Sequence, residues 1–151
     1  MGKKTPRTRL FRWLPGAVFL LTAALVVAAA LLPGVGLAQT LYVDNGTTYT
    51  LSSGSSITYG DEYVGYSTSG SGTFNQSGGT NTVTAYLLLG YYNSGSYSLS
   101  GGTLSAPYEY VGDSGTGTFT QGGGTNTVAD DLYLGYGSGS YSLSGGSLST
   151  P

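Results

Sequence analysis

Short stretches of alternating apolar and hydroxyl-bearing residues repeat along the chain from residue 41 onward. An aromatic residue follows Gly-Thr or Gly-Ser at Phe74, Tyr97, Phe119 and Tyr141, at intervals of 22 or 23 residues, and Tyr49 is a weaker first member of the series. Alternation with a period of two is typical of β-strands, and no segment has helical spacing. The pattern predicts about five turns of a unit of roughly 22 residues.

A second series with a similar period consists of aliphatic residues at the ends of the expected strands, each of the last four directly before a glycine. We expect these side chains, and those of the aromatic series, to point into the interior. Alternation then directs the residue before each aliphatic residue outward. The aliphatic series is Val43, Val64, Leu89, Val111 and Leu134, and the expected outward residues include Tyr63, Leu88, Tyr110 and Tyr133.

Each unit contains three extended segments rich in Tyr, Thr, Val and Phe, separated by Gly and Ser. A single unit cannot bury enough apolar surface to offset the entropy of ordering its backbone, so successive units must stack. The expected fold is all-β: a single-stranded parallel β-solenoid over residues 39–151, right-handed as strand crossovers prefer. A sandwich of antiparallel hairpins is the alternative, and it explains the short strands but not the constant register.

Glycine pairs and polar residues recur at the expected corners of each coil. The pairs, such as Gly78-Gly79 and Gly101-Gly102, belong where positive φ is required. Two further positions alternate between an amide and leucine from one coil to the next, and we expect the amides to bond backbone groups at the corners. These positions are Gln76, Leu99, Gln121 and Leu143, and Asn81, Leu104, Asn126 and Leu148.

Residues 1–38 have the pattern of an export signal helix. A basic stretch ends at Arg12, an apolar run follows over residues 17–32, and small residues lead to Ala38. This arrangement predicts a signal peptide of the general secretory route, cleaved between Ala38 and Gln39. An uncleaved membrane anchor is the alternative, because the apolar run approaches the length that spans a bilayer. In either case the membrane would be contacted only through this segment.

The charges are divided along the chain. All five Lys and Arg residues precede residue 13, all seven Asp and Glu residues follow residue 43, and there is no His or Cys. Nucleic-acid binding needs cations at phosphates, zinc needs Cys or His, and Ser-His or Cys-His catalysis needs a base that is missing here. We therefore expect no enzyme activity, no cofactor and no nucleic-acid partner. The expected location, secreted or on the cell surface, follows instead from the signal pattern of residues 1–38.

Carboxylates are the remaining candidates for chemistry. Glu62 and Glu109 occupy the same position two coils apart, roughly 10 Å along the axis, a separation that suits an inverting glycosidase. We expect them instead to be solvated surface charges, with no catalytic residue in the chain. Calcium binding by Asp44-Asn45-Gly46 or Asp130-Asp131 is a weaker alternative, and neither has the spacing of calcium-binding repeats, so no metal site is assigned.

The segment from Gly117 to Val128 and the segment from Gly139 to Gly146 resemble the Gly/Ser/Thr-rich repeats of bacterial secreted proteins. Such repeats occur in autotransporter passenger-like proteins and in proteins with a PEP-CTERM sorting tail. The resemblance covers essentially the whole of residues 39–151. It implies a pectin-lyase-like β-helix shown on, or released from, a bacterial surface.

Three functions fit such a repeat. The first is a non-catalytic structural or adhesive module. The second is binding of extracellular glycans by an exposed tyrosine column, Tyr42, Tyr63, Tyr110 and Tyr133, because exposed aromatic rows can stack on sugar rings. Ice binding by the Thr-x-Thr motifs ranks last, because the intervening coils have Thr103-Leu104-Ser105 and Ser147-Leu148-Ser149.

The sequence also predicts an open end. Residues 148–151 match residues 104–107, after which the next strand of the earlier coil begins. An open coil offers unpaired N–H and C=O groups to another chain. We expect self-association through this end, or a longer repeat protein.

Overall fold

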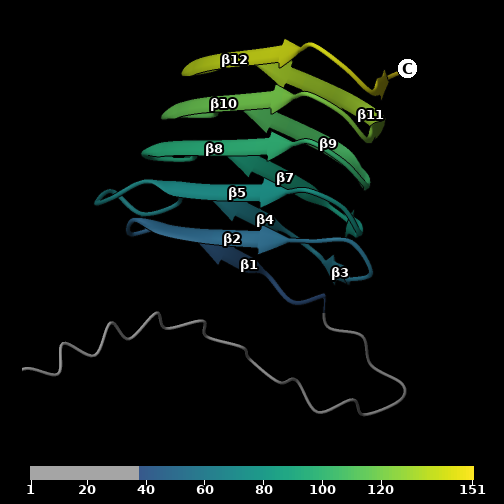
Figure 1. Cartoon of the computed structure of the whole chain (residues 1–151). Coiled ribbons are helices and arrows are strands. Elements are labelled where there is room, and N and C mark those ends of the chain that lie inside the picture. Colours follow the sequence, from purple (N-terminus) through teal and green to yellow (C-terminus); the bar gives the residue numbers. More distant parts are fainter. Residues whose placement is uncertain (1–37) are drawn as a thin grey trace, which may run out of the picture. The chain divides into compact units, whose positions relative to one another are not determined.

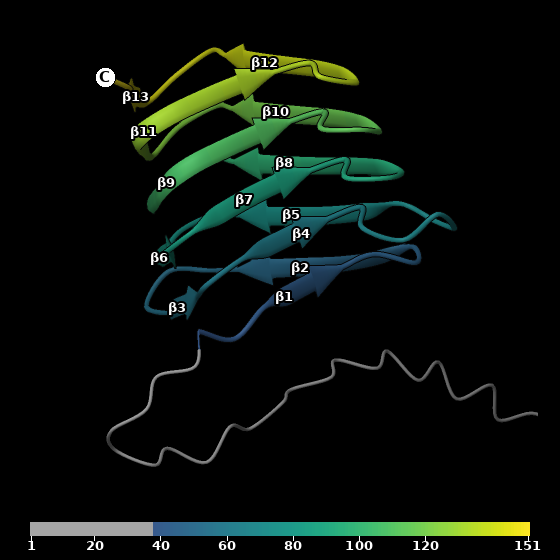
Figure 2. The ribbon, with the colours of Figure 1, turned by 180° about the vertical axis from the view of Figure 1, so that it is seen from behind.

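Residues 38–151 form a stack of β-strand coils in the computed structural model (Figure 1). Each coil lies one step further along a single axis, and the two sheets form opposite sides of the stack, as the view from behind also shows (Figure 2). The predicted export signal, including its helix, lies outside these residues apart from Ala38. Within residues 38–151 no helix is long and apolar enough to cross a membrane.

One side of the stack is a five-stranded sheet in which every neighbouring pair is parallel. The register is constant, so that equivalent residues of successive coils lie side by side. The order is β2 (Thr47–Leu51), β5 (Gly72–Gln76), β8 (Ser94–Leu99), β10 (Thr116–Gln121) and β12 (Ser138–Leu143).

The other side is an eight-stranded parallel sheet. In the lower coils it consists of separate short strands, and in the upper coils two of these merge into one bent strand. Its members are β1 (Leu41–Val43), β3 (Ser56–Tyr59), β4 (Glu62–Val64), β6 (Thr80–Val83), β7 (Tyr86–Leu89), β9 (Thr103–Val111), β11 (Thr125–Leu134) and β13 (Ser147–Ser149).

The predicted parallel solenoid of about five coils is therefore confirmed, and the antiparallel sandwich is wrong. The predicted three segments per coil are also visible, with β9 and β11 each combining two of them. In β11 the register shifts between Val128 and Asp131, where this strand carries one residue more than β9 at the bend.

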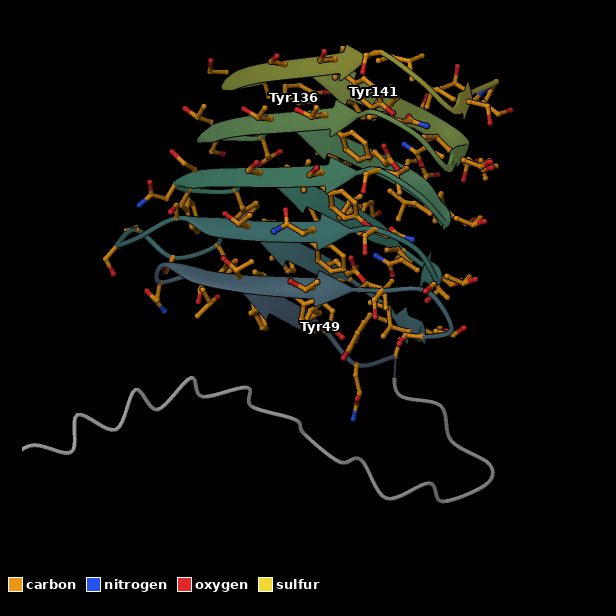
Figure 3. The ribbon with its side chains drawn as sticks, in the orientation of Figure 1. Tyr49, Tyr136 and Tyr141 are labelled. Carbon is orange, nitrogen blue, oxygen red and sulfur yellow. The ribbon has the colours of Figure 1, made fainter. Side chains whose placement is uncertain are left out.

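The interior is a ladder of aromatic rings bordered by aliphatic side chains. Phe74, Tyr97 and Phe119 are fully buried, and their ring centroids are 4.5 and 5.0 Å apart along the axis. Tyr49 at the lowest coil and Tyr141 at the highest continue the ladder and are only partly buried (Figure 3). This confirms the inward assignment of the aromatic series.

The aliphatic series occupies the inward position in every coil, because Leu134 is in register with the buried Val111. Val43, Val64, Leu89 and Val111 are 0–2% exposed, whereas Leu134 is 54% exposed. Leu134 is exposed because β13 pairs only with the first part of β11, so no described strand lies against Leu134 from above.

Glycines permit both the corners and the tight stacking. Gly79 and Gly102, the second members of their pairs, have φ of 72° and 84°, which confirms the prediction of positive φ at the corners. Gly95 has a different role inside β8, where a Cβ would overlap the backbone carbonyl of Val64 in the coil below. The coils can approach each other there only because the side chain is absent.

Candidate functional site

Ten of the 14 tyrosines gather on the outer side of the sheet that contains β1, β4, β7, β9 and β11, and on the turns that follow these strands. The predicted tyrosine column is present, since the register aligns Tyr42 with Tyr63, and Tyr110 with Tyr133. Leu88 occupies the position between the two pairs and divides the column. It is only 7% exposed, although it lies outside the main core cluster.

Two aromatic clusters therefore make up this surface, which we call the tyrosine face. Rings within each cluster contact one another in stacked or edge-on pairs, with centroids 4.3–6.2 Å apart. The lower cluster is Tyr42, Tyr63, Tyr66, Tyr91 and Tyr92, and the upper cluster is Tyr86, Tyr108, Tyr110, Tyr133 and Tyr136.

The column predicted from sequence supplies only four of these residues. Six others were missed, although a sequence signal exists for three, because Tyr66, Tyr91 and Tyr136 each follow the glycine that ends a strand. Tyr136 is 71% exposed and Tyr92 is 53% exposed, more than any member of the column.

Carboxylates lie beside the tyrosine face. Partial burial raises the pKa of Tyr63, and the negative charges of Asp61 and Asp113 add to this effect. The pKa of Tyr91 is raised chiefly by its neighbour Tyr92, whose ring centroid is 4.3 Å away. The face therefore combines neutral phenols, exposed ring edges and nearby carboxylates.

The same geometry limits sugar stacking on the column itself. Tyr42 stacks on Tyr63 at an interplanar angle of 10°, and Tyr110 on Tyr133 at 16°, so one face of each ring is covered by its neighbour. A sugar ring stacks on a free aromatic face. The more exposed Tyr92 and Tyr136 are therefore better candidates for such a contact than the column.

The interior contains the second unusual feature, two glutamates. Glu62 and Glu109 are both 0% exposed. The expectation that they are solvated surface charges is wrong, because each lies two residues before an inward valine and alternation directs it to the same side. Leu87 lies between them in register, so the two carboxyl groups occupy the same interior position two coils apart.

Glu62 belongs to a hydrogen-bonded network that crosses the interior. The Nδ2 of Asn81 donates to Glu62 Oε2 at 2.9 Å and to the hydroxyl of Tyr97 at 3.2 Å. The Tyr97 hydroxyl donates to Gln76 Oε1 at 2.5 Å, and Gln76 Nε2 donates to the carbonyl of Thr103 at 2.9 Å. The network thus joins one coil to the coil above it.

An identical network repeats two coils higher. Asn126 donates to Glu109 at 3.0 Å and to Tyr141 at 3.3 Å, and Tyr141 donates to Gln121. Gln121 Nε2 donates to the carbonyl of Ser147 at 2.8 Å. The predicted backbone bonds are therefore confirmed for the glutamines, whereas both asparagines bond side chains instead.

The alternation of amide and leucine now has a structural meaning. Coils that carry Glu, Gln and Asn inside, which we call polar coils, alternate with coils that carry aliphatic residues at those three positions. We call the latter leucine coils, because all three residues are Leu except in the first coil, where Ile57 is in register with Asn81. Within the described residues, each Tyr of the core ladder belongs to a leucine coil, and Tyr97 and Tyr141 direct their hydroxyls to the polar coil below. A polar coil and the leucine coil above it form one hydrogen-bonded unit.

Ionised glutamates leave buried acceptors without donors. Glu62 Oε1 and Asn81 Oδ1 are buried without a hydrogen-bond partner, as are the same atoms of Glu109 and Asn126. When the carboxyl group of Glu62 is ionised, both of these oxygens can only accept, whereas a proton on the carboxyl group would supply a donor beside the asparagine that already bonds it. Residues 38–151 contain no Lys, Arg or His that would neutralise the charge. Burial accordingly raises the pKa of both glutamates to about 7, and the asparagine hydrogen bonds oppose this shift.

The Tyr97 hydroxyl should contribute measurably to stability. Tyr97→Phe leaves Gln76 Oε1 buried without a donor, and we expect the unfolding free energy to fall by about 1–3 kcal/mol. Tyr49→Phe is the matched control from the same ladder, because within the described residues the Tyr49 hydroxyl makes no hydrogen bond, and it should cost less than about 1 kcal/mol. Urea unfolding followed by circular dichroism measures both. Equal losses in the two variants would contradict the network.

The two candidate calcium sites are ordinary turn and strand segments. Asp44 accepts a hydrogen bond from Asn45 Nδ2 at 2.9 Å within its turn, and Asp131 accepts one from the Tyr133 hydroxyl at 3.2 Å. Within residues 38–151 no group of three or more acidic residues lies close enough together to hold a metal ion.

In comparisons with family models, curated proteins and solved structures, no match to this chain was found.

Proposed function

We propose that residues 39–151 form a non-catalytic structural and adhesive module of a bacterial surface or secreted protein, exported by the general secretory route. The observation that carries the proposal is the constant parallel register of the five-stranded sheet, together with the stacked rings and hydrogen-bonded networks that fill the interior. This organisation directs stabilising contacts along one axis and suits a spacer. The basic and apolar pattern of residues 1–38 supports export.

The proposal predicts that the chain reaches the cell exterior and promotes attachment there. A bacterial host would produce the full chain with an epitope tag after Pro151, and antibody binding to intact cells, the medium and lysed cells would locate it. We expect the tag on intact cells or in the medium, and stronger attachment of producing cells to a solid surface. Retention of the tag inside intact cells, or unchanged attachment, would contradict the proposal.

A second candidate is carbohydrate binding by the tyrosine face. The supporting observation is the combination of exposed rings at Tyr92 and Tyr136 with carboxylates such as Asp113 near Tyr63 and Tyr110. Aromatic stacking together with polar hydrogen-bonding groups is the usual chemistry of sugar recognition.

A glycan array tests this candidate. We expect Tyr92→Ala and Tyr136→Ala to lower the binding of any recognised glycan about tenfold or more, since each removes a stacking surface. Tyr63→Ala and Tyr110→Ala should have smaller effects, because one face of each ring is covered. Thr120→Ala, on the outer side of β10 in the other sheet, is the matched control. Binding that survives all four tyrosine changes would exclude the tyrosine face.

Self-association through the open end of the solenoid stays a prediction. Leu134 and Leu143 are 54% and 50% exposed in the coil that contains β12, and a second copy seated there would cover them. Sedimentation at increasing concentration should show assembly that Leu134→Ser and Leu143→Ser reduce. A wild-type chain that stays monomeric throughout would contradict it.

A further inference from the structure

The tyrosine face concentrates almost all of the accessible redox chemistry of the described chain. Residues 38–151 contain no Cys, Met, Trp or His, the other side chains that oxidants commonly attack. They do contain all 14 tyrosines, ten of which lie on the tyrosine face. Of the other four, Tyr97 is fully buried, Tyr49 and Tyr141 are partly covered in the core ladder, and Tyr59 in β3 is partly buried. A one-electron oxidant in solution therefore meets this chain chiefly at the tyrosine face.

The lower cluster places two exposed rings of different coils together. Tyr42 in β1 is 51% exposed, and Tyr66, which follows β4, is 36% exposed. Their centroids are 4.9 Å apart at an interplanar angle of 66°, so the edge of one ring is directed at the other. Coupling of two tyrosyl radicals takes place between ring-edge carbons beside the hydroxyls, and in this pair the two rings are already in edge-to-face contact.

The other rings of the lower cluster can pass a radical to this pair. Tyr66 lies 5.5 Å from Tyr91 and 5.9 Å from Tyr92, and Tyr91 and Tyr92 are 4.3 Å apart. Tyr92 is 53% exposed and is the most accessible member. Oxidation of any exposed ring of the cluster thus places the radical within contact distance of several phenols.

We propose that the tyrosine face is a site of oxidative modification, at which a haem peroxidase with hydrogen peroxide joins Tyr42 to Tyr66 as a dityrosine bridge between successive coils. Each phenol gives up one electron and one proton. The two radicals form a carbon–carbon bond, and the hydrogens on the two bonded carbons move to the oxygens to restore both phenols. The two electrons and two protons reduce one hydrogen peroxide to two waters. The product is a covalent link along the axis in a segment without cysteine.

Such a bridge would stabilise the solenoid as a disulfide stabilises a small secreted domain. It would close a loop between two coils and restrict the unfolded chain, so the first coil could not separate from the second. This goes beyond the proposed structural role and does not depend on it, because the bridge is defined by chemistry and geometry alone.

The test treats the full, folded chain with a peroxidase and hydrogen peroxide. We expect a monomer lighter by two hydrogen atoms, dityrosine fluorescence, and a cross-linked peptide that joins Tyr42 to Tyr66 after proteolysis and mass spectrometry. The bridged chain should also unfold at a higher temperature than the untreated one. The same treatment in urea, where the rings are no longer held together, should lose this peptide.

Two phenylalanine variants make the test specific. Tyr66→Phe keeps the ring in place but removes the oxidisable hydroxyl, so the cross-linked peptide that joins residues 42 and 66 and the rise in unfolding temperature should both be lost. Tyr136→Phe changes the most exposed tyrosine of the upper cluster and should leave the Tyr42–Tyr66 peptide unchanged. If Tyr66→Phe fails to fold, the peptide map of the wild-type chain in buffer and in urea decides. No dityrosine, dityrosine only between molecules, or a folded chain without the Tyr42–Tyr66 link would overturn the proposal.

Discussion

The unfolding free energy of the solenoid should fall as the pH rises from about 5 to about 8, the opposite of the usual effect of native carboxylates. Burial raises the pKa of Glu62 and Glu109 to about 7 in the folded chain, from an ordinary value of 4.5. Between these values the folded state holds more protons than the unfolded state, so stability decreases with pH. It is greatest below pH 4.5, where both states are protonated, and its decrease is complete above about pH 7.

The expected loss is large for a chain of this size. A difference of one pKa unit corresponds to about 1.4 kcal/mol, so each glutamate lowers the unfolding free energy by about 3 kcal/mol across this range. Small domains have a net stability of about 5–15 kcal/mol, and the two glutamates together remove much of it. Urea unfolding at a series of pH values measures the loss directly.

Glutamine variants separate this cause from general charge effects. Glu62→Gln with Glu109→Gln reproduces the hydrogen bonding of the protonated acids, because the new amide donates to Asn81 or Asn126 and cannot ionise. The double variant should be nearly as stable at pH 8 as the wild type at pH 5. Asp130→Asn, at an exposed position, is the control and should keep the wild-type slope. A double variant with that slope would show that the glutamates do not cause the pH dependence.

The substitution Gly95→Ala should destabilise the solenoid by about 3 kcal/mol, although it adds only one methyl group. The new Cβ would overlap the carbonyl oxygen of Val64 and the backbone nitrogen of Gly90. These backbone atoms belong to neighbouring coils fixed by hydrogen bonds, such as the one from the Gly90 nitrogen to the Val64 carbonyl at 2.7 Å. The clash can therefore be relieved only by separating the coils.

Gly122→Ala is the matched control for this prediction. A Cβ at Gly122 has only Ser144 Oγ within 4 Å, at 3.9 Å, and the equivalent residues of neighbouring coils are serines. We expect a change within about 0.5 kcal/mol of wild type, because a surface substitution without strain has little effect. Thermal unfolding of both variants at one pH provides the comparison. Similar melting temperatures for Gly95→Ala and the wild type would show that the coils are not tightly apposed there.

The sequence was sufficient to predict the solenoid because its repeat is a physical constraint. Phe74, Tyr97 and Phe119 recur at almost constant spacing, and only stacking in register gives these rings one common environment. The repeat predicts which side chains point inward but not how completely each one is buried. Leu134 has the same sequence context as Leu89, but its exposure depends on whether another strand covers it, and the repeat does not encode this.

The buried glutamates were mispredicted for a different reason. The alternation that directs Val64 inward also directs Glu62 inward, but the general rule that unpaired carboxylates stay in water opposed this assignment. Glu62 can be buried because Asn81 donates a hydrogen bond to its carboxyl group and because burial raises its pKa, which favours the uncharged form. The residue type alone does not reveal this combination. The tyrosine face was found only in part, because turn residues such as Tyr66 and Tyr92 lie outside the period-two pattern.

Because polar and leucine coils alternate, the interior of the solenoid repeats every two coils and not every single coil. Removal of one leucine coil would place two polar coils in contact, and Phe119 would stand where the hydroxyl of Tyr97 now meets Gln76. Removal of one polar and one leucine coil together would restore the alternation and every bond of the networks. Coils added or removed in pairs would therefore keep these hydrogen bonds, whereas an odd number would leave one mismatched layer. A slip of the register by one coil during folding would likewise leave the buried amides without partners.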